Sequence, residues 1–475
     1  MSEKSAIPTV LEGIVSARRG HLAEIRERIS HVETSALEPS TRSLYQQLHG
    51  KTNRFIMECK SSSPSLGLIR EHYQPGDIAR VYSRYASGIS VLCEPERFGG
   101  DYDHLATVAM STHLPVLCKD FIIDEVQIHA ARYYGADAIL LMLSILNDEE
   151  YANLAAVAKS LGLDVLTEVI DAEEVERALA LGAKIIGVNH RNLHDLSIDL
   201  NRTEQLAQKL PEDCVVVAES GIRNNATVRM LGKHANAFLV GSQLTSQPDI
   251  DAAARELVYG HNKVCGLTSS SAAQAARAAG AVYGGLIFEE ASPRNVSRET
   301  ANKIMADETE LRYVAVSRRT EGWEQLLAGL DDAPFALQLH APYQGSIDAE
   351  IALIESVRQA AGGDVAEIWR AISMTQEDGP RLARALNEHV DRLILDAGDG
   401  GTGTTFDWSH IPPEVKAQSL LAGGLNASNL RAALDISTQG VDLNSGVESS
   451  RGVKDSGLIA EAFRTIRLYT NDSHV

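Results

Sequence analysis

From residue 55 onward the chain alternates short apolar runs with amphipathic, helix-like segments. The apolar runs have the length of strands, and segments between them, such as residues 148–161 and 172–181, have apolar residues at helical spacing. Gly135 and Gly182 stand where a helix would end before the next strand. Buried strands that alternate with helices predict a parallel sheet with helices outside it. The first eight runs are residues 55–60, 89–94, 115–121, 138–144, 164–169, 185–191, 215–220 and 237–242.

The same pattern repeats in the second half of the chain. Two series of eight strands predict an α/β protein of two consecutive (β/α)₈ barrels, which we place at residues 1–258 and 259–475. Residues 251–260 are expected to form the closing helix of the first barrel, with no flexible linker after it, so the junction is expected to be fixed. Residues 8–48 have helical spacing and predict an extra N-terminal helical segment that caps one end of the first barrel or folds over its rim. The second eight runs are residues 262–267, 283–288, 311–317, 335–340, 366–373, 392–397, 419–424 and 440–445.

The composition limits the class of protein. The 475 residues leave room for two domains of barrel size, and a net charge of −20 disfavours nucleic acid and anionic membranes as partners. The five cysteines form no CxxC pair, which argues against a disulfide framework and a zinc site. The N-terminus shows no apolar core of signal-peptide length, and no run of 18 apolar residues occurs in the sequence. We therefore expect a cytoplasmic protein, and a fused pair of barrels favours a monomer.

In the first series, ionisable residues gather where the predicted strands end. Glu58 and Lys60 are two residues apart on one strand, so their side chains point to the same side. Taken alone, this pair can be a salt bridge at a strand end. Burying many charges is costly unless they are paired or used, and barrel enzymes place their chemistry at this rim, so the whole set predicts acid–base catalysis. The other members are Lys119, Glu168, Asn189, Arg191, Glu219 and Ser220.

The second series has a sparser set of such residues. Cys265 ends its first strand and Asp396 its sixth, which suggests an acid–base pair in which a thiolate takes a proton and a carboxyl gives one. Taken alone, Cys265 would be a buried structural cysteine. His340 ends the fourth strand of the series, and Arg294 lies in the loop after the second. The glycine-rich stretch 398–403 opens no GxGxxG helix and predicts a lid or a phosphate-side loop.

Small residues recur after the last two strands of both series. In barrels, the loops after strands seven and eight commonly hold a phosphate through backbone N–H groups. A single Gly-Ser pair would indicate only a turn, but its recurrence at matching positions predicts a phosphate site in each barrel. These residues are Gly221, Gly241 and Ser242 in the first barrel and Gly424, Ser445 and Gly446 in the second.

The motifs of both halves resemble those of two known enzyme families. The first half resembles indole-3-glycerol-phosphate synthase, and the second resembles phosphoribosylanthranilate isomerase. In this order, the chain is similar to the fused bifunctional enzymes of bacterial tryptophan biosynthesis. The first set of motifs is Glu58-Cys-Lys60, Ser63-Pro-Ser65, Cys118-Lys-Asp-Phe121, Leu166-Thr-Glu-Val169, Asn189-His-Arg191 and Glu219-Ser-Gly221. The second set is Lys263-Val-Cys-Gly266, Ser292-Pro-Arg294, Gln338-Leu-His340, Ala422-Gly-Gly424 and residues 442–448.

The resemblance implies two reactions on small phosphorylated anthranilate–ribose compounds, without cofactor or metal. The isomerase half would perform an Amadori rearrangement, with Cys265 as general base and Asp396 as general acid. The synthase half would close the indole ring with loss of CO₂ and water, with Lys119 as general acid and Glu168 in later proton transfers. The assisting catalytic residues implied are Glu58, Lys60, Asn189 and Glu219. The substrate-binding residues implied are Ser63, Phe121, Arg191, Ser220, Gly221, Gly241, Ser242, Arg294, Gln338, His340, Gly424, Ser445 and Gly446.

The chain departs from the family pattern at a few positions. Leu66 stands where lysine is common, Asn192 where aspartate often follows the arginine, and Ala341 where glycine usually follows the histidine. Leu66 removes a charge near the substrate loop, so substrate affinity is expected to differ.

Two other functions also suit a pair of phosphate-binding barrels. One is an enzyme for a different phosphosugar, such as those of histidine biosynthesis, which would lead with paired aspartates. The other is a binding or regulatory protein, which would have lost one acid–base partner. Both partners are present in both halves, which favours the bifunctional enzyme.

Overall fold

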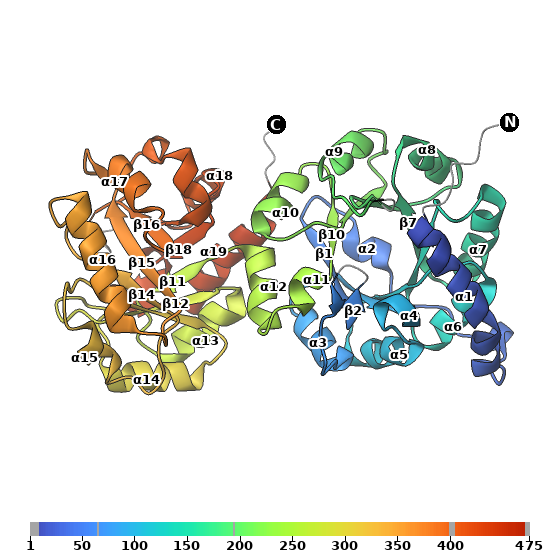
Figure 1. Ribbon diagram of the computed structural model, residues 1–475, viewed down its shortest axis with the longest axis horizontal. Helices are drawn as coiled ribbons and strands as arrows, with labels where there is room; N and C mark the ends of the chain where they lie inside the picture. The colour runs from blue at the N-terminus through green and yellow to red at the C-terminus, as the bar shows by residue number, and fades with distance from the viewer. Residues whose placement is uncertain (1–8, 64–65, 193–194, 399–403, 471–475) are drawn as a thin grey trace. The chain divides into compact units, whose positions relative to one another are not determined.

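The computed structural model describes residues 9–63, 66–192, 195–398 and 404–470 (Figure 1). The chain forms two compact units, one of the residues up to Ala254 together with Thr470 and one spanning Arg255–Tyr469, and the first division falls within α12 (Ile250–Tyr259). The domain limits at residues 258 and 259 stay a prediction. Among the described helices, none is long and apolar enough to cross a membrane.

The first unit is a closed barrel of eight parallel strands, in the order β1-β10-β9-β8-β7-β6-β5-β4. The predicted barrel is therefore confirmed. Its strands are β1 (Arg54–Cys59), β4 (Gly88–Leu92), β5 (Val116–Lys119), β6 (Ala138–Met142), β7 (Asp164–Val169), β8 (Ile185–Asn189), β9 (Val215–Glu219) and β10 (Ala237–Val240). Its longer helices are α3 (Pro75–Tyr82), α5 (Tyr102–Ser111), α6 (Glu125–Tyr133), α7 (Asp148–Ser160), α8 (Ala172–Ala180), α9 (Asn201–Ala207) and α10 (Asn225–Leu231).

The N-terminal segment adds helices to this barrel, but not one continuous helix. It forms α1 (Thr9–Arg28), a single 3₁₀ turn and α2 (Leu44–Leu48). The prediction of helix over residues 8–48 is therefore wrong for most of residues 29–43. There Ser40 bonds to the barrel instead, its N–H donating to the Leu161 carbonyl and its hydroxyl to Asp137, and Ser43 caps α2. Leu11 and Leu48 belong to the barrel's hydrophobic core.

The second unit is also a closed barrel of eight parallel strands, β11 to β18 in sequence order, as predicted. Its strands are β11 (Lys263–Cys265), β12 (Tyr283–Ile287), β13 (Arg312–Ser317), β14 (Ala336–Leu339), β15 (Glu367–Ser373), β16 (Arg392–Asp396), β17 (Ser419–Leu421) and β18 (Gly440–Leu443). Its helices include α13 (Ser270–Ala279), α14 (Arg298–Asp307), α15 (Trp323–Leu327), α16 (Ile347–Ala361), α17 (Gly379–Leu386), α18 (Leu430–Asp435) and α19 (Ser456–Leu468). A short antiparallel hairpin of β19 (Glu448–Ser450) and β20 (Val453–Lys454) follows β18.

Alternation along the strands explains how polar groups come to lie above the core of the first barrel. Residues two apart on a strand point to the same side, so each core residue is followed by one that faces the rim. The core positions Ile56, Leu117, Leu166 and Val217 are followed in this way by Glu58, Lys119, Glu168 and Glu219. The barrel thus has an apolar layer and, above it, a layer of ionisable groups.

Candidate active sites

A cavity of about 180 Å³ lies at this rim of the first barrel. Side chains from several strand ends line it, together with apolar residues of α1 and β6. Ten predicted site residues line the cavity: Glu58, Lys60, Ser63, Lys119, Phe121, Glu168, Asn189, Arg191, Ser220 and Ser242. Glu219, Gly221 and Gly241 stand next to these residues without lining the cavity itself.

Glu58 holds the two lysines of this cavity. Its Oε1 lies 2.5 Å from Lys60 Nζ and its Oε2 lies 3.0 Å from Lys119 Nζ. Burial opposes ionisation of Glu58, but the ammonium groups of Lys119 and Lys60 outweigh it and lower the pKa of Glu58 to about 2. Burial likewise opposes the charge of Lys119, yet the carboxylates of Glu58 and Glu219 raise its pKa. Lys119 is therefore a charged donor held at the cavity wall.

The other two carboxyl groups of the cavity, those of Glu168 and Glu219, have raised pKa values. Asn189 Nδ2 donates to Glu168 Oε1 at 3.0 Å, and Glu219 Oε2 lies 3.7 Å from Lys119 Nζ. Burial raises the pKa of Glu168, and burial together with the neighbouring Glu168 raises the pKa of Glu219 to about 8. The cavity thus combines a charged lysine acid with a carboxyl group, that of Glu219, that holds a proton near neutral pH, a combination suited to general acid–base catalysis.

The loops after β9 and β10 bring backbone N–H groups to the same rim. Ser220 and Gly221 have φ of 68° and 78°, a left-handed conformation that glycine adopts readily and serine rarely. At Gly241 a Cβ atom would come 2.5 Å from Lys60 Cε and 2.6 Å from Glu58 Oε1, so a larger residue there would displace the Glu58–Lys60 pair. The short helix α11 (Ser242–Thr245) starts directly after Gly241. Successive backbone amides in such turns form concave anion sites.

A second cavity, of about 510 Å³, lies at the rim of the second barrel. Seven predicted site residues line it: Cys265, Arg294, Gln338, His340, Asp396, Gly424 and Ser445. Burial raises the pKa of Cys265, which the Lys263 ammonium opposes, and burial raises the pKa of Asp396 to about 6. The structure thus brings the predicted base and acid to one cavity.

Sequence reasoning assigned no role to Lys263 and Asp442, which support Cys265. Lys263 is fully buried, and its Nζ lies 2.8 Å from Asp442 Oδ2 and 3.0 Å from Gln338 Oε1. Gln338, expected to contact substrate, also holds this lysine. Lys263 and Cys265 are two residues apart on β11, so the spacing rule that singled out Glu58 and Lys60 also applied here.

The neighbours of Arg294 fix its orientation, and the surroundings of His340 fix its protonation state. Arg294 forms a two-point ion pair with Glu448, with Nε–Oε1 at 2.7 Å, and Lys454 Nζ lies 2.5 Å from the same Oε1. His340 Nε2 lies 3.9 Å from Asp396 Oδ2. Burial and the Arg370 guanidinium lower the pKa of His340 to about 4, so this ring is neutral near pH 7 and the contact with Asp396 is not an ion pair.

Small residues again shape the loops after the last two strands. Gly423 and Gly424 have φ of 85° and 62°, and Ser445 begins a 3₁₀ turn directly after β18. Gly446 does not line the cavity, but a Cβ atom on it would overlap the Leu425 carbonyl oxygen. This glycine therefore lets the two loops pack together.

Some of the positions singled out in the sequence do not line either cavity, and others fall outside the described residues. Leu66 is exposed and Ala341 is buried. Pro64, Ser65 and residues 399–403, most of the predicted glycine-rich loop, lie outside the described residues. Within the described parts of the chain, no group of three or more His, Cys, Asp or Glu residues could hold a metal ion.

Comparisons with known proteins agree with this geometry. The family model described as indole-3-glycerol phosphate synthase matches residues 11–257, and that of N-(5'phosphoribosyl)anthranilate (PRA) isomerase matches residues 262–465. A tryptophan biosynthesis protein TrpCF from Corynebacterium glutamicum is 66% identical over 98% of each chain. The TrpCF protein of Salmonella typhi is 47% identical over 91% of this chain and 93% of its own, and that of Vibrio cholerae 43% over 94% of each.

Proposed function

The chain belongs to the bifunctional TrpCF family, and from this premise we propose how the residues of its two cavities divide the chemistry. The second barrel isomerises N-(5'-phosphoribosyl)anthranilate, by an Amadori rearrangement, to 1-(2-carboxyphenylamino)-1-deoxyribulose 5-phosphate. The first barrel converts this product to indole-3-glycerol phosphate with loss of CO₂ and water. Both reactions belong to tryptophan biosynthesis.

In the isomerase barrel, Asp396 is the general acid and Cys265 the general base. Asp396 gives a proton to the ribose ring oxygen, and the bond from this oxygen to C1' breaks to leave an iminium group. Cys265, as thiolate, then removes the proton from C2', and the enol formed becomes the ketone when C1' is protonated. The Lys263 ammonium beside Cys265 favours the thiolate, and a carboxyl group with a pKa of about 6 keeps part of its protons near neutral pH.

Binding groups surround this acid–base pair. Arg294, oriented by Glu448, is suited to the substrate carboxylate, because a guanidinium fork matches two carboxylate oxygens. His340 and Gln338 line the same cavity and are suited to contact the substrate. Gly424, Ser445 and the packing of Gly446 form the phosphate site.

In the synthase barrel, Lys119 is the general acid. It protonates the substrate carbonyl oxygen while the aromatic ring carbon attacks, and CO₂ leaves from that carbon to restore aromaticity. The hydroxyl group left behind must depart as water, which requires a further proton donor and a base, and we assign these steps to Glu168 and Glu219. The observation that carries the proposal is Lys119 Nζ, held charged 3.0 Å from Glu58 Oε2 at the cavity wall.

The remaining residues of this cavity hold and orient the substrate. Lys60, held by Glu58, and Asn189, held by Glu168, line the cavity and stabilise the charge that develops on the substrate. Arg191 is suited to the carboxylate that is later lost as CO₂. Phe121 offers an apolar face to the aromatic ring. The phosphate site comprises Ser63, Ser220, Gly221, Gly241 and Ser242.

Replacing Lys119 tests this division of labour. Lys119→Ala is expected to lower synthase kcat at least ~10²-fold, because the carbonyl loses its proton donor, while isomerase kcat stays within about twofold. The two activities are measured separately, by indoleglycerol phosphate formation and by loss of anthranilate-type fluorescence. Lys184→Ala, which removes an exposed lysine of the same barrel, is the control and should change neither. Synthase activity that survives Lys119→Ala would remove this lysine from the mechanism.

We further propose domain limits at 1–258 and 259–475, a monomer, and a cytoplasmic location. Each family model lies inside one of these ranges, which supports the limits. Each cavity is lined by residues of its own unit, which supports an active monomer. Sedimentation equilibrium and cell fractionation test the last two statements.

A further inference from the structure

The helix α1 forms part of the synthase cavity, although it precedes the barrel in sequence. Leu11 and Ile14, on this helix, line the cavity together with Lys119 and Phe121 of the β5 end. A substrate can therefore contact Lys119 only if α1 and the β5 end stay at a fixed distance from each other. None of the catalytic residues assigned above lies on α1.

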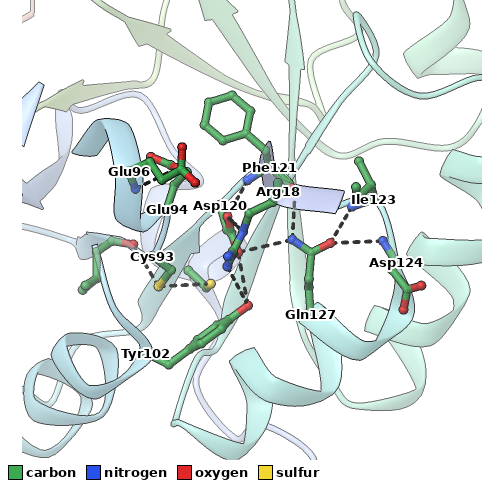
Figure 2. Close-up of polar contacts among 12 residues, drawn as sticks. Arg18, Cys93, Glu94, Glu96, Tyr102, Asp120, Phe121, Ile123, Asp124 and Gln127 are labelled. Atoms are coloured by element: carbon green, nitrogen blue, oxygen red, sulfur yellow. Dashed lines mark hydrogen bonds and ion pairs between the residues drawn. The ribbon is translucent and has the colours of Figure 1, made fainter. Parts of the chain in front are cut away.

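Arg18, about one turn beyond Ile14, joins α1 to the β5 end through Asp120. Its Nε lies 2.9 Å from Asp120 Oδ1 and a terminal nitrogen lies 2.7 Å from Oδ2, a two-point ion pair (Figure 2). Arg18 is 3% exposed and Asp120 1% exposed. Asp120 directly follows Lys119 in the chain, so the pair fixes the backbone next to the proposed general acid.

Asp120 is the centre of a buried network on the β5 end. Tyr102 donates its hydroxyl to Oδ2 at 3.1 Å, and the Phe121 N–H donates to Oδ1 at 2.8 Å. Gln127 donates from Nε2 to Asp120 at 3.3 Å and to the Phe121 carbonyl at 2.9 Å (Figure 2). These bonds orient the turn that carries Lys119 and Phe121, and Arg18 joins α1 directly to Asp120 at the centre of the network (Figure 2).

We propose that Arg18 is a positioning residue of the synthase reaction: by binding Asp120 it sets Lys119 and Phe121 against the apolar wall of α1. This inference rests on the role proposed for Lys119 and extends it to a residue outside the cavity. A buried ion pair contributes little net stability compared with apolar side chains of similar size, but it fixes geometry at both ends. Catalysis depends on such geometry, since a displacement of about 1 Å costs about 10²-fold in rate.

The test is Arg18→Met, which keeps most of the length of the side chain and removes its charge. Synthase kcat is expected to fall about 10- to 100-fold, at a temperature well below the thermal transition, while isomerase kcat in the same molecules stays within about twofold. Arg18→Lys, which keeps one donor and the charge, should recover part of the lost kcat and decides the matter if the methionine variant does not fold.

The chain offers a matched control in Arg26, which joins α1 to the start of α6. Its terminal nitrogen lies 2.6 Å from Asp124 Oδ2, but this pair is largely exposed. Arg26→Gln should leave both activities within about twofold, because an exposed ion pair is weak and does little to fix the positions of the elements it joins.

A double-variant cycle separates positioning from stability. If Arg18 acts through Asp120, Arg18→Met combined with Asp120→Asn should lower synthase kcat no further than the worse single change. A lowered thermal transition with unchanged synthase kcat in Arg18→Met and Arg18→Lys would overturn the inference and make the pair merely structural. If Lys119→Ala keeps synthase activity, the role of Lys119 fails instead, whatever the Arg18 variants show.

Discussion

The buried carboxyl groups of the two acid–base clusters differ in protonation state because their neighbours differ. Glu58 lies between two lysines and has a pKa of about 2, whereas Glu219, which faces Glu168, has a pKa of about 8. Asp396, with few cationic neighbours, has a pKa of about 6. When nearby acids in one site have well-separated pKa values, the one with the high pKa can donate a proton and the one with the low pKa stays ionised.

The pair of Asp396 and Cys265 predicts a pH dependence of the isomerase. The reactive form carries one proton on the pair, since the acid must hold a proton and the base must have lost one. Below about pH 6 both groups are protonated, so kcat/KM should fall about tenfold per pH unit as the pH decreases further. Asp396→Asn should lower kcat/KM about 10²-fold and move the acidic limb to higher pH, because only the thiol of Cys265, whose pKa burial raises, then titrates in the pair; kcat/KM is measured from pH 5 to 9.

The substrate requires its own control in this experiment, because a phosphate ester also ionises near pH 6. An acidic limb that persists unchanged in Asp396→Asn would belong to the substrate phosphate and would contradict the assignment to Asp396. The synthase profile of the same variant should match that of the unchanged protein.

At this scale, residue types and strand ends could be predicted from the sequence, but the ion pairs between residues far apart in the chain could not. The alternation of side chains along a strand was enough to place Lys119 and Glu168 on the rim. The partners of Arg18 and Arg294 lie about one hundred or more residues away in the chain, at Asp120 and Glu448. Only the closed barrel brings such residues together, so no local pattern could reveal them.

At the scale of elements, the strands were the most predictable part because burial on both faces leaves a strong apolar signal. All sixteen strands occur where predicted, although several end sooner, so that Lys60 and Ser220 follow their strands. The segment at residues 29–43 was wrongly predicted as helix. Hydrogen bonds to the barrel hold its backbone instead of helical ones. Loops follow tertiary contacts more than local periodicity.

The loops of the isomerase phosphate site yield a prediction about Gly446. A methyl group there would overlap the Leu425 carbonyl, so Gly446→Ala should push the two loops apart and raise the isomerase KM about tenfold or more. Isomerase kcat should change less than KM, because the acid–base pair stays in place. Steady-state kinetics with varied N-(5'-phosphoribosyl)anthranilate measure both constants.

Gly363 is the control for this substitution. No atom lies within 4 Å of the place that its Cβ would occupy, and its φ is not positive. Gly363→Ala should therefore leave KM unchanged. An unchanged KM in Gly446→Ala as well would show that the loops do not depend on this close approach.

At the scale of the whole molecule, each unit closes its own barrel and encloses its own core and cavity. A destabilising substitution at a buried residue of one barrel should therefore first lower the activity of that barrel. The two reactions, assayed in the same sample, report the state of each unit separately.

The buried pair of Glu350 and Arg370 in the isomerase barrel provides the test. Glu350 accepts from two guanidinium nitrogens of Arg370 at 2.8 and 2.9 Å, and both side chains are almost fully buried. Glu350→Gln leaves the guanidinium without its counter-charge, which costs about 3–5 kcal/mol in such pairs. For a unit of this size, that loss lowers the thermal midpoint by roughly 10 °C.

The expected result is therefore selective inactivation. Isomerase activity of Glu350→Gln should be lost roughly 10 °C below that of the unchanged protein, while the synthase midpoint shifts little. Glu414→Gln, which breaks an exposed pair with Arg384 in the same barrel, should shift neither midpoint by more than about 2 °C. If synthase activity fell together with isomerase activity in Glu350→Gln, the units would unfold as one, and the stability of each active site would belong to the whole chain.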